Sequence, residues 1–164
     1  MSTETNFLKL TRKNFEEMKS QAEKAMDQLS VEELHFAPNE ESNSIAIIVK
    51  HMSGNLRSRF SSFLTTDGEK PDRNRDGEFI GEYESRNALL EDWESGWNVL
   101  FGTLGDLTDS DLDRTVFIRQ EPYSVMSAIQ RSVVHSMGHV GQIIYIAKMI
   151  KNDSWKTLSI PRAK

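Results

Sequence analysis

Four long stretches of this sequence repeat their apolar residues every three or four positions, which is the spacing of one face of an α-helix. A helix with one apolar face must bury that face against another element. The stretches run from about Thr5 to Leu29, from Ile45 to about Phe63, from the residue after Ser85 to Gly105, and from Ser124 to about Lys151. Asn43 or Ser44 is expected to cap the second helix. The pattern therefore predicts an all-α fold, a four-helix bundle.

Two connections between the predicted helices are long. The first, from Asp67 to Glu84, is polar and contains glycine and proline. The second, from Asp106 to Tyr123, predicts a turn of helix at Ser110–Leu112 and a small β-hairpin that pairs Thr115–Ile118 with the residues near Tyr123. We interpret both as long crossings of the bundle. Connections of this length in compact domains often carry function.

The overall composition is that of an ordinary globular domain. With 164 residues the chain is expected to form one domain, residues 1–164. Its 20 Lys and Arg and 25 Asp and Glu give a net charge of −5, which argues against a general surface for nucleic acid or anionic membrane. No apolar run approaches the roughly 18 residues that would suggest a membrane span. We expect neither nucleic acid nor membrane as a partner.

The sequence contains no cysteine. This excludes disulfides, cysteine-type zinc sites and thiol nucleophiles of the protein itself. A reducing cytoplasm is the simplest compartment for such a chain. If the protein carries out thiol chemistry, the thiol must come from a small molecule.

Three of the four histidines fall within the predicted helices and indicate a metal site. His135 and His139 are four residues apart, so they lie on one face of the last helix and can bind one ion together. His51, in the second helix, would complete a three-nitrogen site with a position left for water or substrate. The alternative is that all three are packed, hydrogen-bonded core residues. His35, in the loop before Pro38, is not expected to bind the metal.

The residues around the histidines narrow the chemistry. In a zinc protease helix of the HExxH type, a glutamate acts as the general base, but Ser136 occupies that position here. Any base must come from elsewhere. Asn55 and Gln142 lie one turn from His51 and His139 and could support the ligands, or could be polar residues at the rim of the bundle.

Two further features have both a structural and a functional interpretation. Trp97 is expected to fill core, with a wall of the substrate pocket as the alternative. The segment from Asp67 to Asp76, DGEKPDRNRD, is either a solvated loop or a lid whose arginines meet an anionic substrate or a partner subunit.

The chain resembles the DinB-like superfamily, also called YfiT-like, over nearly its whole length. The resemblance rests on the helical pattern, on His51 in the second helix, and on the pattern from His135 to Ile143, HSMGHVGQI, in the fourth. The segments SNSIAIIVKHMSGN, DGEKPDRNRD and SWKTLSIPRAK look like a branch without an assigned function, found mainly in Bacillus-type bacteria.

The resemblance implies helices that run up, down, down and up, and a divalent metal, Ni or Zn, held by His51, His135 and His139. It also implies homodimers formed through the bundle helices. Some relatives transfer a low-molecular-weight thiol, bacillithiol or mycothiol, to electrophiles. A bacillithiol-type S-transferase acting on small molecules is therefore the leading hypothesis. The alternatives are a metal-hydroxide hydrolase, or a non-catalytic protein that is stabilised by metal and binds a small molecule.

Overall fold

The computed structural model describes residues 3–160 and is mainly helical. The ends of the expected domain, residues 1–2 and 161–164, lie outside the described residues. The α-helices of the described part are α1 (Thr3–Met26), α2 (Val31–His35), α3 (Ile45–Phe60), α4 (Arg86–Asp106) and α5 (Val125–Lys151). The strands are β1 (Thr115–Ile118) and β2 (Glu121–Ser124), and single turns of 3-10 helix form η1 (Asp76–Phe79), η2 (Asp109–Asp111) and η3 (Asn152–Ser154).

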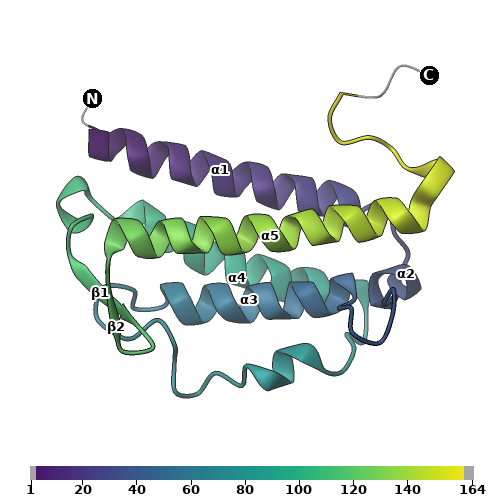
Figure 1. Cartoon of the computed structure of the whole chain (residues 1–164), viewed down its shortest axis with the longest axis horizontal. Helices are drawn as coiled ribbons and strands as arrows, with labels where there is room; N and C mark the ends of the chain where they lie inside the picture. Colours follow the sequence, from purple (N-terminus) through teal and green to yellow (C-terminus); the bar gives the residue numbers. More distant parts are fainter. Residues whose placement is uncertain (1–2, 161–164) are drawn as a thin grey trace.

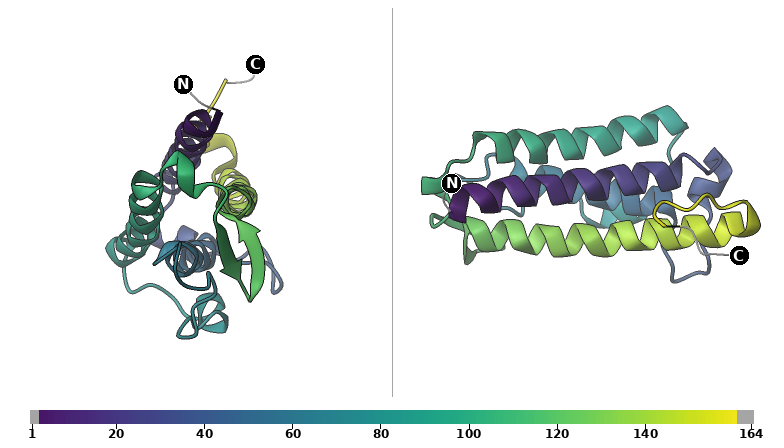
Figure 2. Two further views of the ribbon diagram at one scale, coloured as in Figure 1. Left: turned by 90° about the vertical axis from the view of Figure 1, so that its left-hand side faces the viewer. Right: turned by 90° about the horizontal axis from the view of Figure 1, so that it is seen from above.

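The four long helices lie side by side, with α1 and α5 running in one direction and α3 and α4 in the other (Figures 1 and 2). Helix α3 packs against α4 and α5, and α1 packs against α5 and α4. The helices thus run up, down, down and up in chain order. The predicted helices correspond to these four. The short α2 was not predicted, because a helix of 5 residues is too short to show a period.

Only one of the two long connections crosses the length of the helices. Residues 61–85, called here the crossing segment, run along the outside of α3, because α3 and α4 are parallel and the chain must return to the end where α3 began (Figure 1). The predicted second crossing, from Asp106 to Tyr123, is wrong, because the connection between α4 and α5 (residues 107–124) stays at one end (Figure 1). Helix α5 is antiparallel to α4 and starts where α4 stops, so this connection is long in sequence but short in space.

Serine side chains mark the starts of the helices that carry the site. Ser44 Oγ accepts a hydrogen bond from the backbone N–H of Ile47, and Ser124 Oγ accepts one from Ser127, each at a helix N-terminus. Helix α3 ends at Phe60, earlier than predicted, because Ser62 adopts a left-handed conformation with φ 48°.

The core lies between the four long helices. Phe15, Met52, Trp93, Leu100 and Ile143 are among its fully buried apolar residues, and they come from all four helices. No helix within residues 3–160 is long and apolar enough to cross a membrane.

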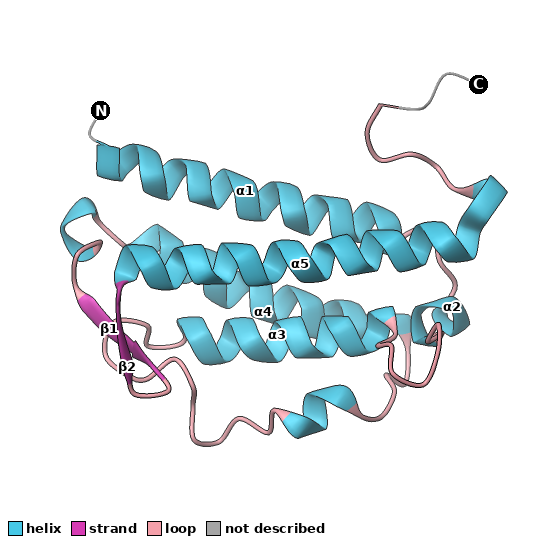
Figure 3. Ribbon diagram, in the orientation of Figure 1, coloured by secondary structure: helices cyan, strands magenta, loops and turns pink. Residues whose placement is uncertain are grey.

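The predicted hairpin is present at one end of the helices and is joined to the crossing segment (Figure 3). Its turn residues, Arg119 and Gln120, have positive φ angles of 55° and 66°, as a tight two-residue turn requires. The Asp67 carboxylate accepts hydrogen bonds from the backbone N–H groups of both, at 2.9 and 2.7 Å, and from that of Glu69 at 2.7 Å. The start of the crossing segment is therefore fixed to the hairpin turn.

Replacing this carboxylate should loosen the junction. In Asp67→Ala, three backbone N–H groups lose their acceptor, so we expect the free energy of unfolding in urea to fall by about 1–3 kcal/mol. Asp72→Ala, which removes an exposed carboxylate from the same segment, is the control and should change it by less than about 0.5 kcal/mol. Equal effects of the two substitutions would contradict the assigned role.

Candidate metal centre

The fold brings together the three histidines that the sequence indicated. His51 comes from α3, and His135 and His139 come from successive turns of α5. One ligand nitrogen of each ring lies within 4.8 Å of the corresponding atoms of the other two. The ring centroids are 4.6–5.2 Å apart. Three imidazoles from two neighbouring antiparallel helices thus converge on one point.

Two of the three rings are oriented by oxygen acceptors. The Nδ1 atom of His51 lies 2.9 Å from Oε2 of Glu78, and Nδ1 of His139 lies 2.8 Å from Oε1 of Gln142. An ionised carboxylate or an amide oxygen can only accept, so Nδ1 of each ring carries the proton and donates it. The Nε2 atoms of His51 and His139 are then left with free lone pairs. Metal-binding histidines usually show this arrangement, in which one ring nitrogen donates to an oxygen and the other is free to bind the metal.

The donor set fits a divalent ion. His51 Nε2 and His135 Nε2 are 3.2 Å apart. Because the proton of His51 is on Nδ1, its Nε2 directs a lone pair at His135. Two lone pairs at this distance would repel each other, so either His135 Nε2 carries a proton or a cation lies between the two nitrogens. Three neutral nitrogens that converge in this way are a ligand set for Zn or Ni.

The electrostatics keep the histidines of α5 neutral. Burial, followed by the neighbouring His139 and His51, lowers the pKa of His135 to about 3. Burial also lowers the pKa of His139, although the hydrogen bond with Gln142 acts in the opposite direction. Because both pKa values lie below 6.5, both rings are neutral at pH 7. A neutral imidazole is the form that binds metal.

Glu78 is the functional residue that sequence reasoning missed. It lies in η1 on the crossing segment and is buried, with 7% of its surface exposed. Arg73 donates to both of its oxygens, at 2.7 and 2.8 Å. Burial raises the pKa of Glu78, but the hydrogen bonds from His51 and Arg73 outweigh this and leave the pKa below its ordinary value. Glu78 therefore stays ionised and remains an acceptor for His51. The only hint in the sequence was the general need of a metal-binding histidine for such an acceptor.

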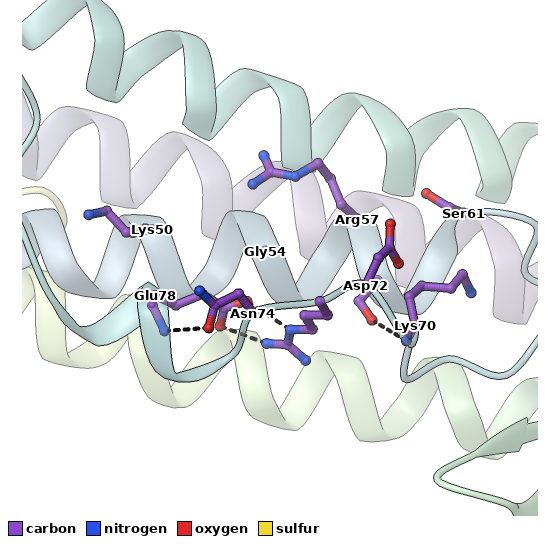
Figure 4. Close-up of a pocket in the computed structure, with 11 residues that line it drawn as sticks. Lys50, Gly54, Arg57, Ser61, Lys70, Asp72, Asn74 and Glu78 are labelled. Carbon is purple, nitrogen blue, oxygen red and sulfur yellow. Dashed lines mark hydrogen bonds and ion pairs between the residues drawn. The ribbon is translucent and has the colours of Figure 1, made fainter.

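Gly54, one turn after His51, makes room for this carboxylate. A Cβ atom at position 54 would lie 2.2 Å from Oε1 of Glu78, closer than any real contact. Figure 4 shows Gly54, Asn74 and Glu78 gathered where the crossing segment passes α3. The absence of a side chain at position 54 allows Glu78 to lie against the helix and reach His51.

Two cavities lie on either side of the contact between α3 and the crossing segment. One, of about 490 Å³, is lined by His51, His135 and Asn55 and by several arginines. The other, of about 560 Å³, lies between α3 and the crossing segment, and its lining includes Lys50, Lys70 and Glu78 (Figure 4). Only the first contains ring nitrogens of the triad, so it is the candidate substrate cavity.

Of the other predicted site residues, two lie at the site and one lies in the core. Gln142 contacts His139, and Asn55 lines the cavity beside His51. Trp97 does not line the cavity. It is fully buried in the core against Phe15 and Trp93, because its position on α4 points between α1 and α3 rather than toward the histidines.

The fourth histidine has a structural role, as expected. His35 Nδ1 lies 2.9 Å from the carbonyl oxygen of Val31, and its Nε2 accepts a hydrogen bond from the backbone N–H of Tyr83 at 3.1 Å. It joins the end of α2 to the end of the crossing segment and lies outside the triad.

The glycine contact leads to a mutational prediction. In Gly54→Ala the Glu78 carboxylate must move away from His51, so we expect the affinity for Zn or Ni to fall about 10- to 100-fold, measured by competition with a chelating dye. Gly102→Ala is the matched control, because a Cβ at that exposed position of α4 meets nothing within 4 Å. It should leave metal affinity unchanged and stabilise the helix by up to about 1 kcal/mol.

A second variant separates the carboxylate from the helix backbone. Glu78→Gln keeps the volume but removes the charge, and it should lower metal affinity to a similar extent as Gly54→Ala. Wild-type affinity in both variants, with the fold intact by circular dichroism, would refute the role given to Glu78.

Comparison with known proteins places the chain in a family. No curated protein matches the chain. One family model does match, over residues 2–164, and it is described as a protein of unknown function, DUF1572. The match covers both histidine-bearing helices and the crossing segment. The chain therefore belongs to DUF1572, a DinB-like family.

Proposed function

We propose that this protein is a divalent-metal-dependent enzyme in which His51, His135 and His139 hold Ni or Zn. We propose further that it transfers a low-molecular-weight thiol of the bacillithiol type to electrophilic small molecules. The observation that carries the proposal is the convergence of three imidazole nitrogens from α3 and α5, two of them oriented by Glu78 and Gln142.

The metal ion, the residues that orient its ligands and the cavity would each have a distinct role in the reaction. A metal ion bound by three histidines keeps a position for an outside ligand, and it lowers the pKa of a thiol or water bound there. Glu78 and Gln142 hold the rings in the ligating tautomer. The cavity of about 490 Å³ beside His51 and His135 is large enough for a small molecule.

The surroundings of the triad favour thiol transfer over hydrolysis. No carboxylate of the described residues lines the histidine cavity. Glu78, which contacts His51, is already held by Arg73 and cannot act as a free base. A thiol that ionises at the metal needs no further base, whereas activated water is usually assisted by one. The chain has no cysteine, so the thiol must be a co-substrate.

Metal content tests the first half of the proposal. We expect about one Ni or Zn per chain after reconstitution of the untagged wild type, measured by mass spectrometry. His51→Ala, His135→Ala and His139→Ala should each lower the affinity by more than about 100-fold, because each removes a ligand and not only its support. His35→Ala is the matched control and should bind as wild type does. A wild type that takes up neither metal would refute the proposal.

Turnover tests the second half. The metal-loaded protein is incubated with bacillithiol and chlorodinitrobenzene, and separately with activated esters. Transfer forms a carbon–sulfur bond and releases chloride, with the thiol proton passing to the buffer. Conjugate formation that requires metal and His135 supports the transferase. Metal-dependent ester hydrolysis without conjugation would replace it with the hydrolase, and metal binding without either reaction would favour the binding protein.

We also propose that the protein forms a homodimer through α5. One face of this helix exposes large apolar side chains, those of Val134, Met137, Tyr145 and Met149, which are 43–72% exposed. Gly138 and Gly141 lie on the same face, and a Cβ at either position would meet nothing within 4 Å. An apolar stripe that contains two glycines is suited to the close approach of a second helix.

A charge in the stripe should separate the subunits. We expect wild type to have twice the chain mass in light scattering after gel filtration, and Tyr145→Glu to shift toward the monomer. Leu10→Glu is the control, because it places the same charge at an exposed apolar position of α1. A monomeric wild type, or an equal shift in both variants, would contradict the proposed interface.

A further inference from the structure

The cavity beside the histidines is lined by five arginines. They come from four segments that are far apart in the sequence: Arg59 from α3, Arg73 and Arg75 from the crossing segment, Arg119 from the hairpin turn and Arg131 from α5. The chain as a whole carries a net charge of −5. A concentration of guanidinium groups in an acidic protein, around one cavity, requires a physical explanation.

Three of these arginines have structural partners. Glu69 accepts from Arg59, Arg73 and Arg119, at distances of 2.9, 3.2 and 3.1 Å, and Arg73 also binds Glu78. This network fastens the crossing segment to α3 and to the hairpin. It places the carboxylates of Glu69 and Glu78 among three guanidinium groups, and the nearby Asp67 carboxylate, which interacts electrostatically with Arg59, adds a third negative charge to the same cluster.

The other two arginines have no such structural task. Arg131 is exposed and lies over the ring of Tyr123, with its guanidinium carbon 5.9 Å from the ring centroid, and no carboxylate of the described residues pairs with it. Arg75 is 50% exposed by side chain and lies over the ring of Phe79, with its guanidinium carbon 5.2 Å from the ring centroid; its one ion pair among the described residues, at 3.8 Å, is with Asp76, whose side chain is 98% exposed. Both arginines can reach a molecule in the cavity.

The arrangement of the arginines relates them to the metal centre. Arg131 is four residues before His135, so the two side chains lie on one face of α5, about one turn or about 6 Å apart along the axis. A group bound between Arg131 and Arg75 would thus lie one helical turn from the triad. Among residues 3–160, no carboxylate lines the cavity itself.

We propose that this cavity is an oxyanion subsite, in which Arg75 and Arg131 bind a carboxylate or phosphate group of a small substrate and so direct its reacting end toward the histidines. The proposal rests on the proposed function only for the location of the reacting end. Guanidinium groups recognise planar carboxylates and phosphates through paired hydrogen bonds. The volume of about 490 Å³ suits a small molecule better than a polymer.

Calorimetric titration of small anions tests this subsite directly. Inorganic phosphate and citrate are titrated at low ionic strength into the full chain, both metal-loaded and stripped of metal by a chelator. We expect both preparations to bind at least one of these anions, and the stronger one to identify the preferred group. Arg131→Gln and Arg75→Gln should each weaken binding about tenfold or more.

The control substitution removes the same charge from elsewhere on the surface. Arg114 is also 50% exposed by side chain but pairs with Asp111, outside the cavity. Arg114→Gln should change anion affinity by less than about twofold, the effect expected from screened long-range charge. Equal losses in Arg114→Gln and Arg131→Gln would overturn the subsite, as would the absence of binding by either anion.

Two further outcomes are distinguishable. Binding that occurs only in the metal-loaded chain and is insensitive to the arginine substitutions would place the anion on the metal, which overturns the subsite but supports the metal centre. Conversely, arginine-dependent anion binding in a chain that takes up no metal would support the subsite and refute the proposed enzyme. Tighter binding of a single-stranded oligonucleotide than of citrate would overturn the choice of a small molecule.

Discussion

The hydrogen bond between His51 and Glu78 is the contact on which the rest of the site depends. It is buried, it spans 27 residues, and it joins the helix that carries the first histidine to the segment that covers it. Removing either partner would leave a polar group stranded away from water. The bond sets the tautomer of His51, and Arg73 in turn keeps Glu78 ionised. The ion pair between Arg73 and Glu78 on the crossing segment thereby determines that Nε2 of His51, and not Nδ1, is free to act as a ligand.

Charge is distributed unevenly around this contact. On the side that faces α3, the crossing segment carries the carboxylates of Glu69 and Glu78, which form ion pairs with Arg59 and Arg73. Toward the cavity it leaves Arg75 accessible, and α5 adds Arg131. The same segment therefore orients a ligand-binding ring with one of its faces and presents positive charge with the other. The ion pairs of Glu69 and Glu78 hold the polar part of the segment against α3 and the hairpin, and Phe63 and Tyr83 pack its two ends onto the core.

The sequence predicted the parts of this structure that follow from local periodicity. The four long helices, the hairpin, and the pairing of His135 with His139 all depend on residues within a few positions of one another. Glu78 could not be predicted, because its partner is 27 residues away and the crossing segment has no period that would fix its register. The prediction of a second crossing was wrong, because the number of residues in a connection does not show whether it runs along the helices or stays at one end. Trp97 fills core, the first of its two interpretations, because an aromatic residue on an apolar helix face usually packs between helices.

The triad has a consequence for when the site can exist during biosynthesis. His51 and His135 are separated by 84 positions, and both α5 histidines follow every other helix that forms the core. A nascent chain that lacks α5 contains only one of the three imidazoles, that of His51. Such a chain has no chelating set with which to capture an ion. An ion that requires all three imidazoles can therefore bind only after α5 has been synthesised and has packed against α3.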